Sequence, residues 1–86
     1  DLGWVEECVN ESVDVALTQN QYDALCSLIL NIGSPAFKGS TLLKLLNAGD
    51  YAAAQQQFLR WDRQKGQPLA GLTRRRHAEA DLFGMP

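Results

Sequence analysis

The sequence predicts an all-α fold, a small five-helix bundle that forms a single domain over residues 1–86. Three observations support this prediction. Hydrophobic residues recur with the 3.6-residue period of a helix, no segment shows the alternation of a strand, and residues that begin or end helices separate the periodic segments. Hydrophobic residues make up 45% of the chain and charged residues 21%, which is the composition of a globular domain. No repeat or linker divides the sequence, so one domain is expected.

The first helix is predicted over residues 2–12. Its residues at i, i+3, i+4 and i+7 fall on one face, and these are Val5, Cys8, Val9 and Ser12. This spacing is typical of an amphipathic helix that packs its apolar face against the rest of a domain.

The second helix is predicted to lie at the centre of the bundle. It begins at Thr18, because Thr18 and Gln21 have the spacing of a capping box, and it runs to about Ile32. Gly33 ends it as a left-handed residue, and Pro35 prevents its continuation. Apolar residues lie nearly all round this helix, which is typical of a buried one: Tyr22, Leu25, Cys26, Ile29, Leu30 and Ile32.

Two further helices are predicted after this stop. Ser40 or Thr41 caps a helix over residues 42–47, and Asp50 caps a helix that runs from residue 51 to about residue 63. One face of the latter carries Ala54, Phe58 and Trp61.

The last helix is predicted over residues 72–83, after an irregular segment over residues 64–71. One stripe of this helix carries Leu72, Arg76, Glu79 and Phe83. An Arg on a stripe that faces the protein needs a carboxylate partner, because an unpaired buried charge is costly. Two interpretations stay open: a local ion pair of Arg76 with Glu79, and an Arg76 that points into a cleft.

Charge and spacing exclude several classes of function. Eight Lys and Arg against ten Asp and Glu give a net charge of -2, which would not attract a nucleic acid. Arg74, Arg75 and Arg76 diverge around a helix, so a helix-turn-helix DNA binder is not expected either. His77 has no partner at metal-ligand spacing, and we expect neither a metal nor another cofactor. The apolar stretches are far shorter than the ~20 residues that span a bilayer, so no membrane span is expected.

The residues also offer no catalytic site of their own. Acid–base catalysis needs two carboxylates held across a cavity, and most acids here are predicted on exposed faces or at helix caps. The Ser and Thr residues have no His in a triad-like order. Cys8 and Cys26 are either two buried thiols or one disulfide. Because the chain opens with Asp1, we expect it to derive from a processed or cut parent chain.

A set of ordered motifs resembles the phage-type lysozymes, or endolysins, of glycoside hydrolase family 24. The motifs are Leu17-Thr-Gln-Asn-Gln-Tyr-Asp-Ala-Leu25, Asn31-Ile-Gly33, Ala36-Phe37, Ser40-Thr-Leu-Leu43, Leu46-Asn-Ala-Gly-Asp-Tyr51, Phe58-Leu-Arg-Trp61 and Gly71-Leu-Thr-Arg-Arg-Arg76. They cover almost the whole chain with the spacing of the family, so the resemblance is specific. It implies the C-terminal helical lobe of a lysozyme-like fold.

The resemblance implies a role in hydrolysis of the β-1,4 bond between N-acetylmuramic acid and N-acetylglucosamine in peptidoglycan. The catalytic Glu of the family lies N-terminal to the matched region, and Glu6 and Glu7 stand in the wrong motif to replace it. We therefore expect no catalytic residue in this chain, which would form one wall of the cleft and be inactive alone. The alternative is a non-catalytic helical module that binds peptidoglycan or a protein partner.

The resemblance also implies site residues, partners and a location. Asn31 and Ser40 would face the saccharide, and Arg76 would support the family's catalytic Glu, which favours the cleft interpretation. The structural alternative for Asn31 and Ser40 is a cap or a turn. An apolar face that the family's opening helix covers would favour a homodimer or pairing with the N-terminal segment. A phage or prophage would encode the protein, which would be made in the bacterial cytoplasm and act in the periplasm or cell wall.

Overall fold

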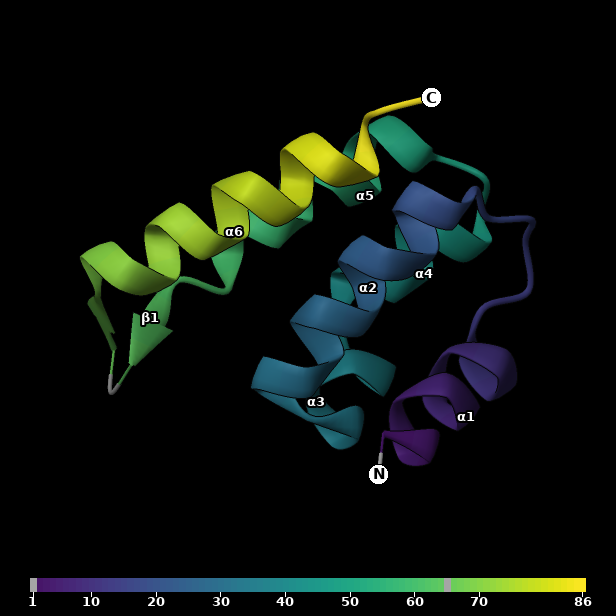
Figure 1. Cartoon of the computed structure of the whole chain (residues 1–86), viewed down its shortest axis with the longest axis horizontal. Coiled ribbons are helices and arrows are strands. Elements are labelled where there is room, and N and C mark those ends of the chain that lie inside the picture. The colour runs from purple at the N-terminus through teal and green to yellow at the C-terminus, as the bar shows by residue number, and fades with distance from the viewer. Residues whose placement is uncertain (1, 65) are drawn as a thin grey trace.

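The computed structural model describes residues 2–64 and 66–86, and within them the chain is mostly helical (Figure 1). The elements are α1 (Gly3–Ser12), α2 (Gln19–Ile32), α3 (Ser34–Lys38), α4 (Thr41–Asn47), α5 (Tyr51–Gln57), the 3-10 helix η1 (Phe58–Arg60), β1 (Arg63–Gln64), β2 (Gln67–Pro68) and α6 (Ala70–Phe83). The all-α prediction is confirmed.

The central helix α2 begins and ends as the sequence predicts. The hydroxyl of Thr18 accepts a hydrogen bond from the Gln21 N–H at 3.0 Å, and the Gln21 side chain accepts one from the Thr18 N–H at 2.9 Å. This capping box satisfies two backbone donors that the helix itself leaves unpaired. Gly33 follows the helix with φ 90°, a backbone conformation that favours glycine.

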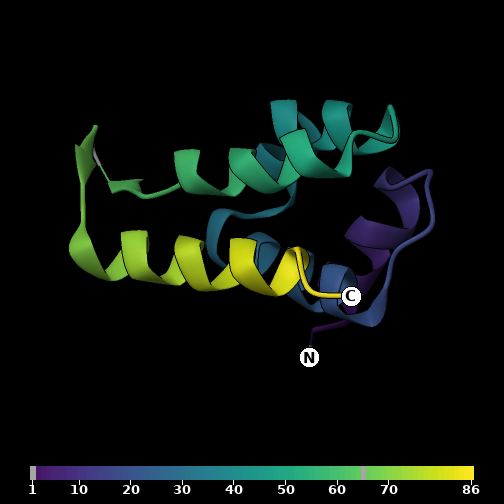
Figure 2. The ribbon, with the colours of Figure 1, turned by 90° about the horizontal axis from the view of Figure 1, so that it is seen from above.

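Helix α6 lies across α2 and beside the α5–η1 segment, and the strand pair joins the two at one end of the molecule (Figures 1 and 2). The strands pair antiparallel, with Gln64 opposite Gln67. Helix α1 packs on the other side of α2 and on α3. The arrangement brings the start of α6, the end of α2 and the residues after η1 together.

One apolar cluster holds these helices together, with contributions from every α-helix. Its fully buried members include Leu25, Leu28 and Ile29 of α2, Leu42 and Leu46 of α4, and Phe37, Ala54 and Phe58. The rings of Phe58 and Phe83 lie 5.3 Å apart between centroids in a tilted arrangement, which fixes η1 against α6.

Several element boundaries differ from the sequence prediction. The described residues form six α-helices instead of five, because Ser34–Lys38 forms the short helix α3 where we predicted no helix. Pro35 stops α2 as expected, but it also stands in the first turn of α3, where a missing N–H costs nothing. The segment over residues 64–71 holds β2 and part of a strand pair that we did not predict, and Lys65 within it lies outside the described residues.

Two helices also have different lengths. The helix predicted to about residue 63 ends at Gln57 and continues as 3-10 turns to Arg60, while α6 begins at Ala70 instead of at residue 72. Leu30, predicted among the buried residues of the central helix, is 46% exposed. The apolar surface of α2 therefore reaches the outside of the molecule near its C-terminal end.

Both cysteines are free thiols and form no disulfide, and only one of the two thiols that we expected to be buried is so. Cys8 is buried, and its sulfur accepts a hydrogen bond from the Ser34 hydroxyl at 3.2 Å. Cys26 is half-buried. Within the described part of the chain, no helix is long and apolar enough to cross a membrane.

Candidate functional site

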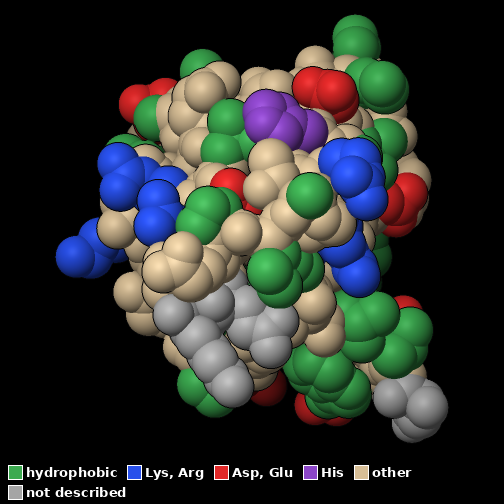
Figure 3. All heavy atoms as spheres, turned by 90° about the vertical axis from the view of Figure 1, so that its left-hand side faces the viewer, with side chains coloured by type: hydrophobic (Ala, Val, Ile, Leu, Met, Phe, Trp, Pro, Cys, Tyr) green, Lys and Arg blue, Asp and Glu red, His purple; other side chains and the backbone are tan. Residues whose placement is uncertain are grey.

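A hollow of about 360 Å³ lies where the end of α2, the residues after η1 and the first turn of α6 meet. It is lined by Asn31, Ile32, Trp61, Arg63 and Leu72. Figure 3 views this end of the molecule, where basic side chains lie on two sides with hydrophobic side chains between them. An amide, a guanidinium and an indole around one concave surface suit a ligand with both polar groups and an apolar face.

Arg76 is hydrogen-bonded to two of the residues that line this hollow. Its side chain has no solvent exposure, yet it donates from one terminal nitrogen, Nη1, to Asn31 Oδ1 at 3.0 Å and to the Trp61 carbonyl at 3.4 Å. Burial lowers the pKa of the guanidinium, and the neighbouring carboxylate of Glu79 opposes that shift. Arg76 therefore connects α6 to two residues that line the hollow.

Glu79 is the buried partner of Arg76. Their Nε and Oε1 atoms lie 2.7 Å apart, in the geometry of a close ion pair more than of an aligned hydrogen bond, and Arg76 Nη2 donates to Oε2 at 3.3 Å. The Ser27 hydroxyl and Arg75 Nε also donate to Oε2, the latter at 3.3 Å. The local ion pair of the sequence prediction is thus present, and the same Arg76 also reaches the edge of the hollow.

Asn31 and Ser40 lie in different surroundings. Asn31 is exposed at the rim of the hollow, with its oxygen turned toward Arg76. Ser40 is buried and caps α4, because its hydroxyl accepts from the Leu43 N–H at 3.1 Å and donates to the Phe37 carbonyl at 2.7 Å. It borders a separate hollow with Lys38, Lys44 and Asn47. The structure therefore brings Arg76 and Asn31 together and leaves Ser40 apart from them.

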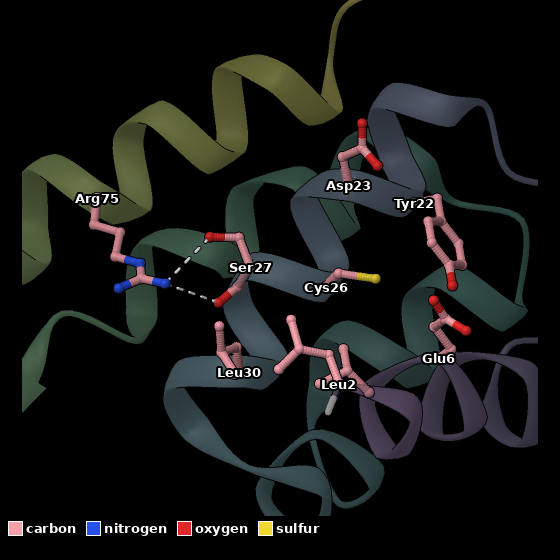
Figure 4. A pocket seen from close by; sticks show the side chains of 9 residues that line it. Leu2, Glu6, Tyr22, Asp23, Cys26, Ser27, Leu30 and Arg75 are labelled. Carbon is pink, nitrogen blue, oxygen red and sulfur yellow. Dashed lines mark hydrogen bonds between the residues drawn. The ribbon is translucent and has the colours of Figure 1, made fainter.

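A second, more apolar hollow of about 340 Å³ lies between α1 and α2. Leu2 and Leu30 lie near one another within it, Arg75 stands at one end, and Glu6 stands with Tyr22 at the other (Figure 4). Both leucines are about half exposed, at 55% and 46%. Burial raises the pKa of Cys26, another lining residue. This is an exposed apolar surface with opposite charges at its two ends.

The described residues contain no group of three or more His, Cys, Asp or Glu side chains that could hold a metal ion. Glu6 and Glu7 are exposed on α1, and neither lines the hollow beside Asn31. The described part of this hollow offers hydrogen bonds and apolar contact to a ligand, without a pair of carboxylates across it.

Sequence reasoning did not find Ser27 and Trp61 as members of the site. Ser27 lies 52 residues from Glu79, and the hydrogen bond from Arg76 goes to the backbone carbonyl of Trp61. A contact with a backbone carbonyl cannot be predicted from the type of residue that carries the carbonyl. For Ser27, a hydroxyl within the otherwise apolar stretch 24–30 of α2 was a usable signal, since a polar group removed from water needs a partner.

Comparisons with known proteins give one consistent result. Residues 1–79 match the family model described as Phage lysozyme. An endolysin of Acyrthosiphon pisum secondary endosymbiont phage 1 is 51% identical over 96% of this chain, and the endolysin of Salmonella phage P22 is 52% identical over 93%. Among solved structures, the muramidase domain of SpmX from Asticaccaulis excentricus is similar with a TM-score of 0.92 and 43% identity, over 99% of this chain.

The chain is shorter than these relatives. It covers 60% of the first endolysin, 55% of the second and 60% of the SpmX muramidase domain. The remaining part of each relative has no counterpart in this sequence.

Proposed function

The chain belongs to the phage lysozyme family, and from this premise we propose that it forms one wall of the peptidoglycan cleft of a muramidase. In this proposal the substrate is the glycan strand, and the bond cleaved is the β-1,4 bond between N-acetylmuramic acid and N-acetylglucosamine. The hollow beside Asn31 would hold part of that strand. The observation that carries the proposal is the contact between Arg76 Nη1 and Asn31 Oδ1, which holds an exposed amide at the rim of a hollow.

The chemistry of the lining residues supports a carbohydrate ligand. The Asn31 amide and the Arg63 guanidinium supply hydrogen-bond donors for sugar oxygens, while Trp61 and Leu72 supply apolar surface for the C–H faces of a pyranose. Ser40 contributes less to this proposal, because its hydroxyl is already engaged with two backbone groups. We assign to it the support of the loop before α4.

Cleavage would require an acid, and no acidic side chain among the described residues lines the hollow. We propose that the acid belongs to the part of the enzyme that has no counterpart in this sequence, and that Arg76 supports it. In this view Arg76 acts from beneath the cleft floor, since its side chain is buried. The enzyme would be made in the bacterial cytoplasm and act on the cell wall, in keeping with the phage endolysins among its relatives.

The apolar hollow between α1 and α2 is suited to bind a second polypeptide segment. Leu2 and Leu30 leave apolar surface exposed there, and Arg75 at one end is opposite in charge to Glu6 and Asp23 at the other. We propose that the N-terminal segment of the lysozyme architecture packs on this surface; a second copy of the chain is the other outcome that a test must separate. Sedimentation of the chain alone and with that segment from a related endolysin distinguishes the two.

The direct test measures binding and cleavage separately. Purified peptidoglycan is incubated with the chain alone and with the chain plus the N-terminal segment of a related endolysin. We expect binding alone and cleavage together, and we expect Asn31→Ala to weaken both. Asn10→Ala, at an exposed asparagine of α1, is the matched control and should change neither. Binding without cleavage in both conditions would favour the non-catalytic module, and absence of binding would refute the proposal.

A further inference from the structure

The guanidinium of Arg76 is divided between two sets of partners. Its Nε and Nη2 atoms face the carboxylate of Glu79, and its Nη1 atom faces Asn31 Oδ1 and the Trp61 carbonyl. Because a guanidinium is planar and rigid, fixing one edge fixes the direction of the remaining nitrogen. The contacts that fix the Glu79 carboxylate therefore also determine the direction of Arg76 Nη1.

Glu79 is held from three directions. Its Oε2 atom accepts from the Ser27 hydroxyl on α2, from Arg75 Nε and from Arg76 Nη2. The Arg75 side chain continues to Ser27, with contacts of 3.4 Å to the carbonyl and 3.5 Å to the hydroxyl (Figure 4). With an exposure of 4%, the carboxylate has little freedom to turn away from these donors.

The last link in this chain of contacts is the amide of Asn31. A guanidinium has only donors, so the amide must turn its oxygen toward Arg76 Nη1. The amide nitrogen Nδ2 then occupies the other corner of the planar group, and its N–H donors belong to an exposed residue at the rim of the hollow. A fixed N–H donor is complementary to a carbonyl oxygen, such as that of an acetamido group on a sugar.

We propose that Glu79 is a positioning residue for ligand recognition. Glu79 fixes Arg76, and Arg76 in turn fixes the orientation of the Asn31 amide. The N–H donors of Asn31 then favour binding of acetamido sugars over sugars without the acetyl group. The identity of the ligand rests on the proposed function, whereas the chain of contacts from Glu79 to Asn31 does not.

Glu79→Gln tests this positioning role, because the substitution keeps the size and burial of the side chain but removes the charge that fixes Arg76. Asp81→Asn removes the same charge from an exposed site of the same helix and is the matched control. The probes are a soluble N-acetylglucosamine trimer and its deacetylated counterpart. We expect Glu79→Gln to weaken binding of the acetylated trimer by roughly 2- to 10-fold, the range for one hydrogen bond. Asp81→Asn should leave it unchanged, and the deacetylated trimer should bind weakly to every variant.

A merely structural role is separated by the double variant. If Glu79 acts through Asn31, Glu79→Gln has no further effect on binding once Asn31→Ala is present. Equal losses in both backgrounds would overturn the proposal, as would unchanged binding by a folded Glu79→Gln protein. Should Glu79→Gln fail to fold, Ser27→Ala removes one donor to Glu79 and keeps the ion pair; it must then give a smaller loss in the same direction.

A second measurement tests the positioning of Asn31 by Glu79 in the absence of a ligand. In ¹⁵N-labelled protein without any probe, Glu79→Gln should shift or broaden the Asn31 side-chain amide resonances, while Asp81→Asn leaves them unchanged. If the unmodified chain binds no acetylated trimer, the proposed function fails, and these resonances still decide the positioning role. Unchanged Asn31 resonances in the Glu79→Gln protein would overturn it.

Discussion

Arg76 and Glu79 pair within one turn of α6, with 2.7 Å between Nε and Oε1, and both side chains are buried. Such a pair contributes little net stability over apolar residues of the same size, because the desolvation of two charges offsets their attraction. Breaking it is costly, since the remaining charge stays buried. The pair therefore makes the site sensitive to any change at either residue.

We predict that Arg76→Met lowers the free energy of unfolding by roughly 3 kcal/mol, the cost of leaving one member of a buried pair. Arg75 and Ser27 still contact Glu79 and limit the loss. Arg74→Met, at an exposed neighbouring Arg, should change stability by less than about 0.5 kcal/mol. Urea denaturation with a constant m-value measures both. Equal stabilities of the two variants would contradict the assignment of Arg76 as a buried, paired residue.

Gly33 and Gly39 provide a matched pair for backbone conformation. Gly33 has φ 90° and ψ 159°, a region that residues with a Cβ avoid, so Gly33→Ala should destabilise the protein by roughly 2 kcal/mol. A Cβ there would lie 3.8 Å from Pro35 Cδ, so contact adds nothing to this cost. Gly39 has φ −92°, and Gly39→Ala should be neutral or stabilise by about 0.5 kcal/mol. Thermal unfolding distinguishes the two, and a similar loss at both positions would show that the backbone argument is wrong.

The helix termini could be predicted because their signals are local. Thr18 with Gln21, and Asp50 with the Ala53 N–H, are separated by three residues, so the sequence itself places donor and acceptor together. The short elements depend on tertiary contacts and could not be predicted in the same way. Pro35 is compatible with both a stop and a first helical turn, and the pairing of β1 with β2 rests on two residues in each strand.

The same distinction applies to the site. Arg76 and Glu79 are three residues apart, and their pairing followed from the stripe on the last helix. Asn31 lies 45 residues from Arg76, and its contact with Arg76 depends on how α2 crosses α6. The resemblance to a family selected Asn31 and Ser40 alike, but only the three-dimensional arrangement separates an exposed amide from a buried cap.

Ser40→Ala tests whether this residue is chiefly a cap. We expect a loss of about 1 kcal/mol in stability, because the Leu43 N–H would lose its acceptor. Binding of the acetylated trimer to the folded variant should be unchanged. Thr41→Ala, at the exposed neighbouring hydroxyl, is the control and should have a smaller effect on stability. A loss of binding without a loss of stability would instead assign Ser40 to the ligand site.

Cys26 should make stability depend on alkaline pH. Burial raises the pKa of its thiol above the value in the unfolded chain, about 8.5. The folded state then binds more protons over the interval between the two pKa values, so the free energy of unfolding falls as pH rises above about 8.5. Burial also raises the pKa of Tyr22, which adds a loss of the same sign near and above pH 10.

The Cys26 contribution is isolated by Cys26→Ser, which does not titrate in this range. Urea denaturation under reducing conditions at several pH values from 7 to 10 compares the two proteins. We expect the stability of the unmodified chain to fall more steeply above pH 8.5 than that of the variant. A steeper fall in the variant would reverse the sign that we assign to this thiol.

Asn31→Asp separates the role of the acceptor oxygen of Asn31 from that of its N–H donors. The carboxylate keeps an acceptor toward Arg76 Nη1 and makes that contact charge-assisted, so stability at pH 7 should be unchanged or raised by about 1 kcal/mol. The same substitution removes both donors from the rim of the hollow. Binding of the acetylated trimer should therefore fall on the order of tenfold while stability does not. Asn10→Asp on α1 controls for the added charge. If Asn31→Asp bound the trimer as tightly as the unmodified chain, the N–H groups of Asn31 would have no part in recognition. Other lining residues, such as Trp61 and Arg63, would then have to bind the ligand.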